Sequence, residues 1–250
     1  MKFTTDGLII AVTKVGENDR AITALTRDNG LVRAFVHGAL KPNGKNSAAT
    51  ALLCYSHLTF SKQKETYHVL ESEVIDVFFG LRSDIEKLSL AQYFCELAKV
   101  MIPDGEESEI FLRLILNSLH FLATDKLDKY SVKAITELRI MTECGFMPDL
   151  IGCRSCGKDT VLPLYLDLKG GDMLCKECKA GVTGDFAELS PTAFTAMRHI
   201  AYSELQKLYS FSLPDEQAKY LSAVTERYLS AQTGHKFKTL EFFHSLETLN

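Results

Sequence analysis

The sequence lacks any apolar run near the roughly 18 residues that a membrane-spanning helix needs, although 46% of its 250 residues are hydrophobic. The apolar stretch in the opening MKFTTDGLIIAVTK is also too short for a secretory signal peptide. Tryptophan, internal repeats and low-complexity segments are absent as well. We therefore expect a cytoplasmic protein without a membrane partner, long enough to form two or three small domains.

Motifs of the common enzyme classes are also absent. The sequence has no G-x-x-x-x-G-K-[ST] phosphate loop, no G-x-S-x-G nucleophile elbow, no H-E-x-x-H zinc motif and no G-x-G-x-x-G after a strand. The seven histidines are scattered along the chain. Glu71 and Glu73 alternate onto one strand face, as is ordinary for a solvated surface. The sequence thus predicts a protein that is not an enzyme.

Acidic residues slightly outnumber basic residues in the chain as a whole, but positive charge is concentrated near its start. The net charge is −4, whereas residues 1–64 contain nine lysines and arginines and four acidic residues, which gives that segment +5 and the remainder −9. Such asymmetry indicates a domain that faces a polyanion. Chance clustering of charge on a solvated face is the plainer alternative.

Four of the seven cysteines form two C-x-x-C pairs, in CRSCGK and CKECKA. This spacing is typical of zinc sites, and four thiolates would fill a tetrahedral shell and leave no position for water. Four free thiols or two disulfides are the alternatives. The sequence therefore predicts a structural zinc ion. Its ligands would be Cys153, Cys156, Cys175 and Cys178. Arg154, Lys158, Lys176 and Lys179 would offset the negative charge of that centre.

Residues 1–80 have the pattern of strands. Five short segments of strand composition are separated by turn signals such as GEND and DNG. In LVRAFVHGA, Val32, Ala34 and Val36 alternate with Arg33, Phe35 and His37. A small closed barrel follows, with an OB-fold as the natural candidate and a five-stranded SH3-like barrel as the alternative.

The rest of the chain changes to helical periodicity. We expect helices in residues 81–150, a zinc-finger hairpin at 151–182, and a second helical part with a short tail at 183–250. Ser190 and Pro191 form a helix start, and Gly234 a helix stop. The predicted fold class is α+β and multidomain: an N-terminal OB-fold β-barrel, then an α-helical domain with an inserted four-cysteine zinc-finger hairpin.

The opening GLIIAVTKVGENDRAITALTRDNGLVRAFVHGALKP resembles the N-terminal barrel of the RecO family of bacterial recombination mediators. These residues carry the resemblance: Gly7, Gly16, Glu17, Asp19, Thr26, Gly30, Leu31, Gly38 and Ala39. ELRIMTECGFMPDLIGCRSCGK, LSPTAF and TGHKFKTLEFF resemble later parts of the family in the same order, so the likeness covers essentially the whole chain. Leu40 is a departure, because arginine is common there in the family.

The resemblance implies a DNA repair and recombination mediator of the RecF pathway. Such proteins bind single- and double-stranded DNA, anneal complementary strands and recognise the acidic C-terminal tail of single-strand-binding protein. With RecR they help to load RecA. A protein adaptor without DNA affinity of its own is the main alternative, and a zinc-dependent hydrolase or deaminase is a third hypothesis that lacks an open metal position.

Candidate contact residues follow from these implications. For DNA phosphates they are Arg20, Arg33, Lys41, Lys45, Lys62 and Lys64, with Lys236 and Lys238 as weaker candidates. Phe35 and Tyr55 are candidates for base stacking or for the core. Arg139 matches the family helix and is the candidate for binding the partner's carboxylate, with an ion pair to a nearby glutamate as the alternative.

Overall fold

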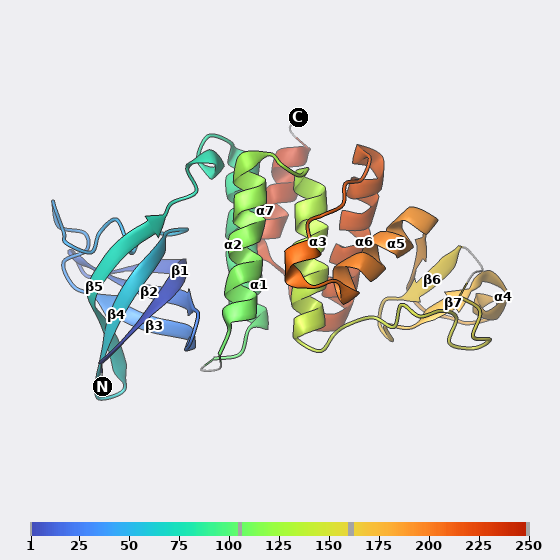
Figure 1. The fold of residues 1–250 in the computed structure, drawn as a ribbon, viewed down its shortest axis with the longest axis horizontal. Coiled ribbons are helices and arrows are strands. Elements are labelled where there is room, and N and C mark those ends of the chain that lie inside the picture. Colours follow the sequence, from blue (N-terminus) through green and yellow to red (C-terminus); the bar gives the residue numbers. More distant parts are fainter. Residues whose placement is uncertain (1, 105–106, 160–162, 249–250) are drawn as a thin grey trace. The chain divides into compact units, whose positions relative to one another are not determined.

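The computed structural model describes residues 2–104, 107–159 and 163–248. The chain forms two compact units (Figure 1). The first comprises residues 1–124 together with 237–250, and the second comprises residues 125–236. Within the described ranges, no helix is both long enough and apolar enough to span a bilayer.

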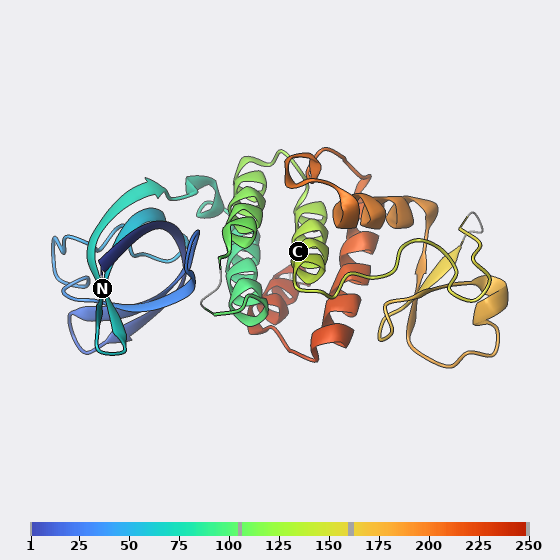
Figure 2. The same ribbon diagram turned by 60° about the horizontal axis from the view of Figure 1, so that its bottom comes forward.

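The first unit contains a closed five-stranded barrel. Its strands are β1 (Lys2–Val15), β2 (Asp19–Thr26), β3 (Gly30–Val36), β4 (Tyr55–Gln63) and β5 (Thr66–Asp76). They pair in the order β1-β2-β3-β5-β4, with β4 returning to β1 and with β3 parallel to β5. Figure 2 shows the strands wrapping into the closed barrel. This order, together with the parallel closing pair, identifies the OB-fold and excludes the SH3-like alternative.

Alternation along the strands builds the core of the barrel. Val32, Ala34 and Val36 point inward as expected, and they join apolar residues of the other strands. The inward set further includes Ile9, Ile22, Ala24, Leu58, Phe60 and Val69. A bulge between Ile9 and Ala11 lets the long β1 strand bend enough to pair with both β2 and β4.

Helices complete the first unit: η1 (Phe79–Leu81), α1 (Ile85–Met101), α2 (Glu109–Thr124) and α7 (Lys238–Glu247). The Asp84 side chain accepts hydrogen bonds from two backbone N–H groups and starts α1. The expectation of a short tail after Gly234 was incomplete, because α7 is a helix that packs on α1. Glu96 of α1 accepts hydrogen bonds from the backbone N–H and the hydroxyl of Thr239 in α7. This contact joins residues far apart in the sequence, so no local sequence pattern predicts it.

The second unit is built on α3 (Lys129–Glu143), α5 (Pro191–Tyr202) and α6 (Asp215–Thr233), with η2 (Leu205–Lys207) between the last two. Ser190 caps α5 and Pro191 occupies its first turn, as predicted. Gly234 ends α6 with φ 62°, also as predicted. Between α3 and α6, Lys133 is buried with its ammonium 2.9 Å from Glu137 and 2.8 Å from Glu226.

The cysteine segment of this unit is a three-stranded sheet. Its elements are β6 (Leu164–Asp167), β7 (Met173–Cys175), the short helix α4 (Lys176–Lys179) and β8 (Phe186–Leu189), and the strand order is β7-β6-β8. The predicted hairpin is β6 and β7, whose turn is fixed because Asp167 accepts the N–H groups of Lys169 and Gly170. Val161 and Leu162, which begin the expected apolar run, lie outside the described residues. Strand β8 was not predicted.

Candidate metal centre and nucleic-acid interface

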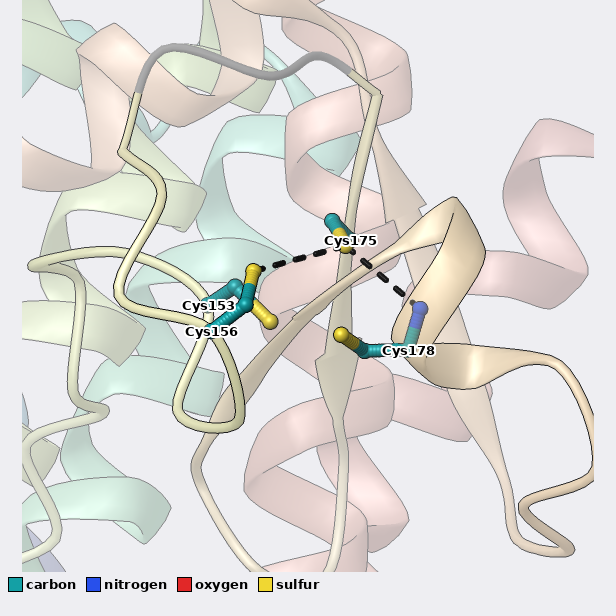
Figure 3. Close-up of side chains that lie close together, drawn as sticks. All are labelled: Cys153, Cys156, Cys175 and Cys178. Atoms are coloured by element: carbon teal, nitrogen blue, oxygen red, sulfur yellow. Dashed lines mark hydrogen bonds between the residues drawn. The ribbon is translucent and has the colours of Figure 1, made fainter.

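The four predicted cysteine ligands come together at one end of the small sheet (Figure 3). Cys153 and Cys156 lie on the loop after α3, Cys175 ends β7, and Cys178 lies in α4. Their sulfur atoms all lie within 4.8 Å of one another, and the Cys156 and Cys175 sulfurs are 3.9 Å apart. Tetrahedral zinc–sulfur bonds of about 2.3 Å place ligand sulfurs about 3.8 Å apart, so the four thiols could bind one such ion.

Backbone geometry explains why these sulfurs converge. Gly157 and Gly181 follow the two knuckles with φ of 70° and 84°, a region that glycine adopts without side-chain clash. The Gly157 N–H donates to the Cys153 carbonyl at 2.8 Å, which closes the first turn. The Cys178 N–H donates to the Cys175 sulfur at 3.5 Å, which orients the second pair.

Other backbone N–H groups near the sulfurs favour the ionised form of Cys153. Burial opposes ionisation of Cys153, but the N–H groups of Cys175, Cys156 and Ser155 outweigh it and lower the pKa of this thiol to about 6. By contrast, burial raises the pKa of Cys95 to about 12 and that of Cys144 to about 11, so those isolated thiols stay protonated at neutral pH. Hydrogen bonds from the Cys178 thiol to the sulfurs of Cys175, Cys153 and Cys156 raise its pKa to about 12, so this thiol would lose its proton only to a bound cation. The four-sulfur donor set suits a soft divalent metal.

The basic residues of the cysteine segment have identifiable partners. Arg154 forms an ion pair with Asp172, and the Lys158 ammonium lies 3.6 Å from Glu177. The Lys179 ammonium lies 5.0 Å from the ring centroids of both Tyr165 and Phe186. Three of the four cations that were expected to offset the charge of a metal–thiolate centre therefore contact carboxylates or aromatic rings near the cysteines.

Five of the six predicted phosphate contacts lie on the surface of the barrel domain. The Arg33 guanidinium is 3.4 Å from Asp104, the Lys45 ammonium 3.6 Å from Glu71, and the Lys62 ammonium 3.5 Å from Glu65. Lys41 and Lys64 are exposed, and neither has an ion pair within the described part of the chain. Exposed ion pairs of this kind contribute only about 0–1 kcal/mol, so an anionic ligand could displace their carboxylates.

Arg20 differs from the other five. Its residue is only 8% exposed, and its Nη1 donates to the carbonyls of Ser47 at 3.1 Å and Thr50 at 3.0 Å. It pairs with Val36 across β2 and β3 and so lies on the inward side of the strand, where it holds the loop before β4. The expectation that Arg20 contacts phosphate is therefore corrected: this guanidinium supports the barrel.

Arg139 likewise makes intramolecular contacts. Its Nη1 donates to the backbone carbonyls of Ser203 at 2.7 Å and Ile200 at 3.2 Å, and its Nη2 lies 2.7 Å from Glu143. Arginine at this position thus satisfies carbonyls at the C-terminal end of α5. The glutamate ion pair, which was the alternative at the sequence level, is present, and the side chain is 10% exposed.

Two histidines on the barrel were not recognised as a group from the sequence. His37 directly follows β3, and its Nε2 is 3.1 Å from Nδ1 of His68 on β5. Strand alternation predicted that Phe35 and His37 share a face, but only barrel closure brings β5 beside them. Asp19 contacts the other nitrogen of His37 at 2.9 Å.

Comparisons with known proteins agree with one another. The family model "Recombination protein O N terminal" matches residues 1–78, and "Recombination protein O C terminal" matches residues 82–241. A protein named DNA repair protein RecO from Acetivibrio thermocellus is 28% identical over 98% of this chain and 97% of its own length. Proteins of the same name from Symbiobacterium thermophilum and Desulforudis audaxviator are 26% identical over 98% of this chain and 33% identical over 71% of it.

Proposed function

Because this chain belongs to the RecO family of DNA repair proteins, we propose that it is a non-enzymatic mediator of homologous recombination that acts directly on DNA. In this proposal it binds single- and double-stranded DNA, anneals complementary strands and recognises single-strand-binding protein. With RecR it helps to load RecA in the RecF pathway. Its place of action is the cytoplasm, at the nucleoid.

The lysines and arginines on the surface of the barrel are the observation that carries the DNA-binding part of the proposal. Residues 1–64 carry +5 in a chain of net charge −4, and the acidic residues of the rest of the barrel, Glu65, Glu71, Glu73 and Asp76, reduce the barrel's net charge to +1. Phosphates would be held by Arg33, Lys41, Lys45, Lys62 and Lys64, of which Lys62 is half-buried and the others are exposed. Binding of this kind is sequence-tolerant and weakens with salt, with a slope of about −0.7 per neutralised phosphate of a single strand.

Zinc would have a structural role. Cys153, Cys156, Cys175 and Cys178 would hold the ion, and their four thiolates would complete its coordination shell. The sheet they join has strands of only three or four residues, too short to be stable alone. We propose that the ion fixes this sheet on the second unit and takes no part in bond chemistry.

Recognition of an acidic protein tail is placed on α5 in this proposal. An open pocket there is lined by Phe194, Arg198, Tyr202 and Ser203, and the Arg198 guanidinium lies 5.6 Å from the Phe194 ring centroid. A carboxylate beside an aromatic side chain would suit that combination. Arg139 would act indirectly, since it binds the carbonyls of Ile200 and Ser203 and so fixes the end of this helix.

Annealing of two complementary strands coated with single-strand-binding protein, followed over a salt series, tests the proposal. We expect this protein to accelerate annealing, with an effect that fades as salt rises. A charge-reversed Arg33→Glu/Lys41→Glu/Lys62→Glu variant should lose the acceleration and keep its binding to the coat protein. Absence of acceleration by the unaltered protein, with coat-protein binding intact, would instead support an adaptor that relies on RecR for DNA contact.

A further inference from the structure

Three aromatic side chains, from β3, from the residue that follows β3 and from β5, form a continuous strip on the outside of the barrel. The ring centroids of His37 and His68 are 5.1 Å apart with planes 15° from parallel, and the Phe35 ring lies 6.0 Å from His68 at 31°. We call Phe35, His68 and His37 the aromatic strip. Its rings are not part of the barrel core, because Ala34 and Val36 fill the inner side of the same strand.

A chain of hydrogen bonds fixes the orientation of the strip. Asp19 accepts the Gly38 backbone N–H at 2.7 Å and contacts Nδ1 of His37 at 2.9 Å. With His37 donating to that carboxylate, its Nε2 accepts from Nδ1 of His68, 3.1 Å away. The two imidazoles are therefore joined through their edges while their planes stay nearly parallel. Such preorganisation lowers the entropy lost when a flat ligand binds.

The surroundings of the strip leave the rings open and provide positive charge. Across the strands, Phe35 is paired with Ala21 and His68 with Ser61, and both of these neighbours are small. Paired residues share a face, so neither obstructs a ligand that lies over the rings. Lys2 of β1 is exposed, and it is paired with Ser61 across the edge of β4 that faces away from His68. Arg33 shares the strand face with Phe35, and Lys41 is an exposed residue of the loop that follows His37.

We propose that the aromatic strip is a stacking platform for unpaired bases of single-stranded DNA, with Lys2, Arg33 and Lys41 holding the adjoining phosphates. This proposal rests on the proposed function, because it requires that the barrel binds DNA. It adds that this face of the barrel recognises the base of the nucleotide. Flat aromatic faces beside cations suit bases on a phosphate backbone. Bases inside a duplex already stack on each other, so the platform selects single strands.

The experiment compares two fluorescently labelled strands with the same number of phosphates, an oligothymidylate and its abasic analogue, by anisotropy with the full chain. We expect the oligothymidylate to bind roughly 5- to 100-fold more tightly. A Phe35→Leu/His68→Leu variant should lower oligothymidylate affinity to the abasic level and leave abasic binding, with its salt slope, unchanged. Phe79→Leu is the matched control, because Phe79 is 75% exposed and lies outside the strip.

A His68→Phe variant separates stacking from folding, since it keeps an aromatic face and removes the hydrogen bond to His37. It should retain the preference for the oligothymidylate, and loss of that preference would overturn the platform. Equal binding of both strands by the unaltered protein would also overturn it, while DNA binding by the barrel would stand. Failure to bind either strand at low salt would overturn this inference together with the DNA-binding part of the proposed function.

Discussion

Arg20 and Arg33 provide a matched test, because both are arginines in neighbouring strands but only one is buried. In Arg20→Met, the carbonyls of Ser47 and Thr50 lose a charged donor. Each such bond contributes about 1.5–3 kcal/mol. The loss is offset because methionine removes a buried guanidinium whose Nε has no hydrogen-bond partner among the described residues, and because its side chain still fills space. We expect a net destabilisation of about 2 kcal/mol.

Urea denaturation followed by circular dichroism measures this effect. With a typical slope of about 2 kcal/mol/M, Arg20→Met should lower the midpoint of barrel unfolding by about 1 M. Arg33→Met should leave the midpoint nearly unchanged, because the Arg33 side chain is 67% exposed and its ion pair with Asp104 is a surface pair. The same variant should lower the salt slope of single-strand binding by about 0.7.

The reasoning would be refuted by the opposite pattern. Suppose that Arg20→Met retained full stability but reduced the salt slope of single-strand binding. The Arg20 guanidinium of the unaltered protein would then have to leave its carbonyl partners and bind phosphate. If Arg33→Met left DNA affinity and its salt slope unchanged, Arg33 on the outer face of β3 would not contact the phosphates of the nucleic acid. Because the chain has two compact units, the barrel transition must be followed separately from that of the second unit.

Three further predictions concern the remaining features. Cys156→Ser should reduce bound zinc, measured with a colorimetric chelator after denaturation, and destabilise the second unit while oligothymidylate binding by the barrel persists; full zinc occupancy would contradict the four-cysteine site. Lys133→Met should destabilise the second unit by about 3–5 kcal/mol, because it leaves Glu137 buried at 0% exposure without its cation, and an unchanged urea midpoint would contradict this. The Gly38 N–H and then His37 hold the pKa of Asp19 below its usual range, so its contribution to stability should be present above the unfolded-state pKa of about 3.9 and be lost as pH falls through the lower folded-state pKa. Urea midpoints measured across that acidic range should therefore vary less with pH in Asp19→Asn than in the unaltered protein.

Features encoded by neighbouring residues could be predicted well from the sequence. The segment EIFLRLILNSLHFLAT, with apolar residues nearly all round, is a predicted helix within residues 81–150, and the structure places α2 at Glu109–Thr124. The start of α5 at Ser190 and Pro191 follows from capping chemistry. The two C-x-x-C pairs predict their own convergence, because a tight knuckle and a short hairpin are local structures. In contrast, α7 begins without a side-chain cap and is held by Glu96 of α1, so the residues around its start do not predict a helix there.

Which side chains lie on the barrel surface depends on pairing between strands that are distant in the sequence. For this reason the sequence alone assigns Arg20 wrongly to the surface. Charge counting treats Arg20 and Arg33 alike, yet the β2–β3 register pairs Arg20 with the inward Val36 and Arg33 with Thr23. Closure of the barrel through parallel β3 and β5 then brings His68 beside Phe35. Neither consequence is visible in a window of adjacent residues. A DNA-binding surface on such a barrel therefore has to be defined by strand register first and by residue type second. For this reason Arg20→Met and Arg33→Met, which remove the same charge, should have different effects.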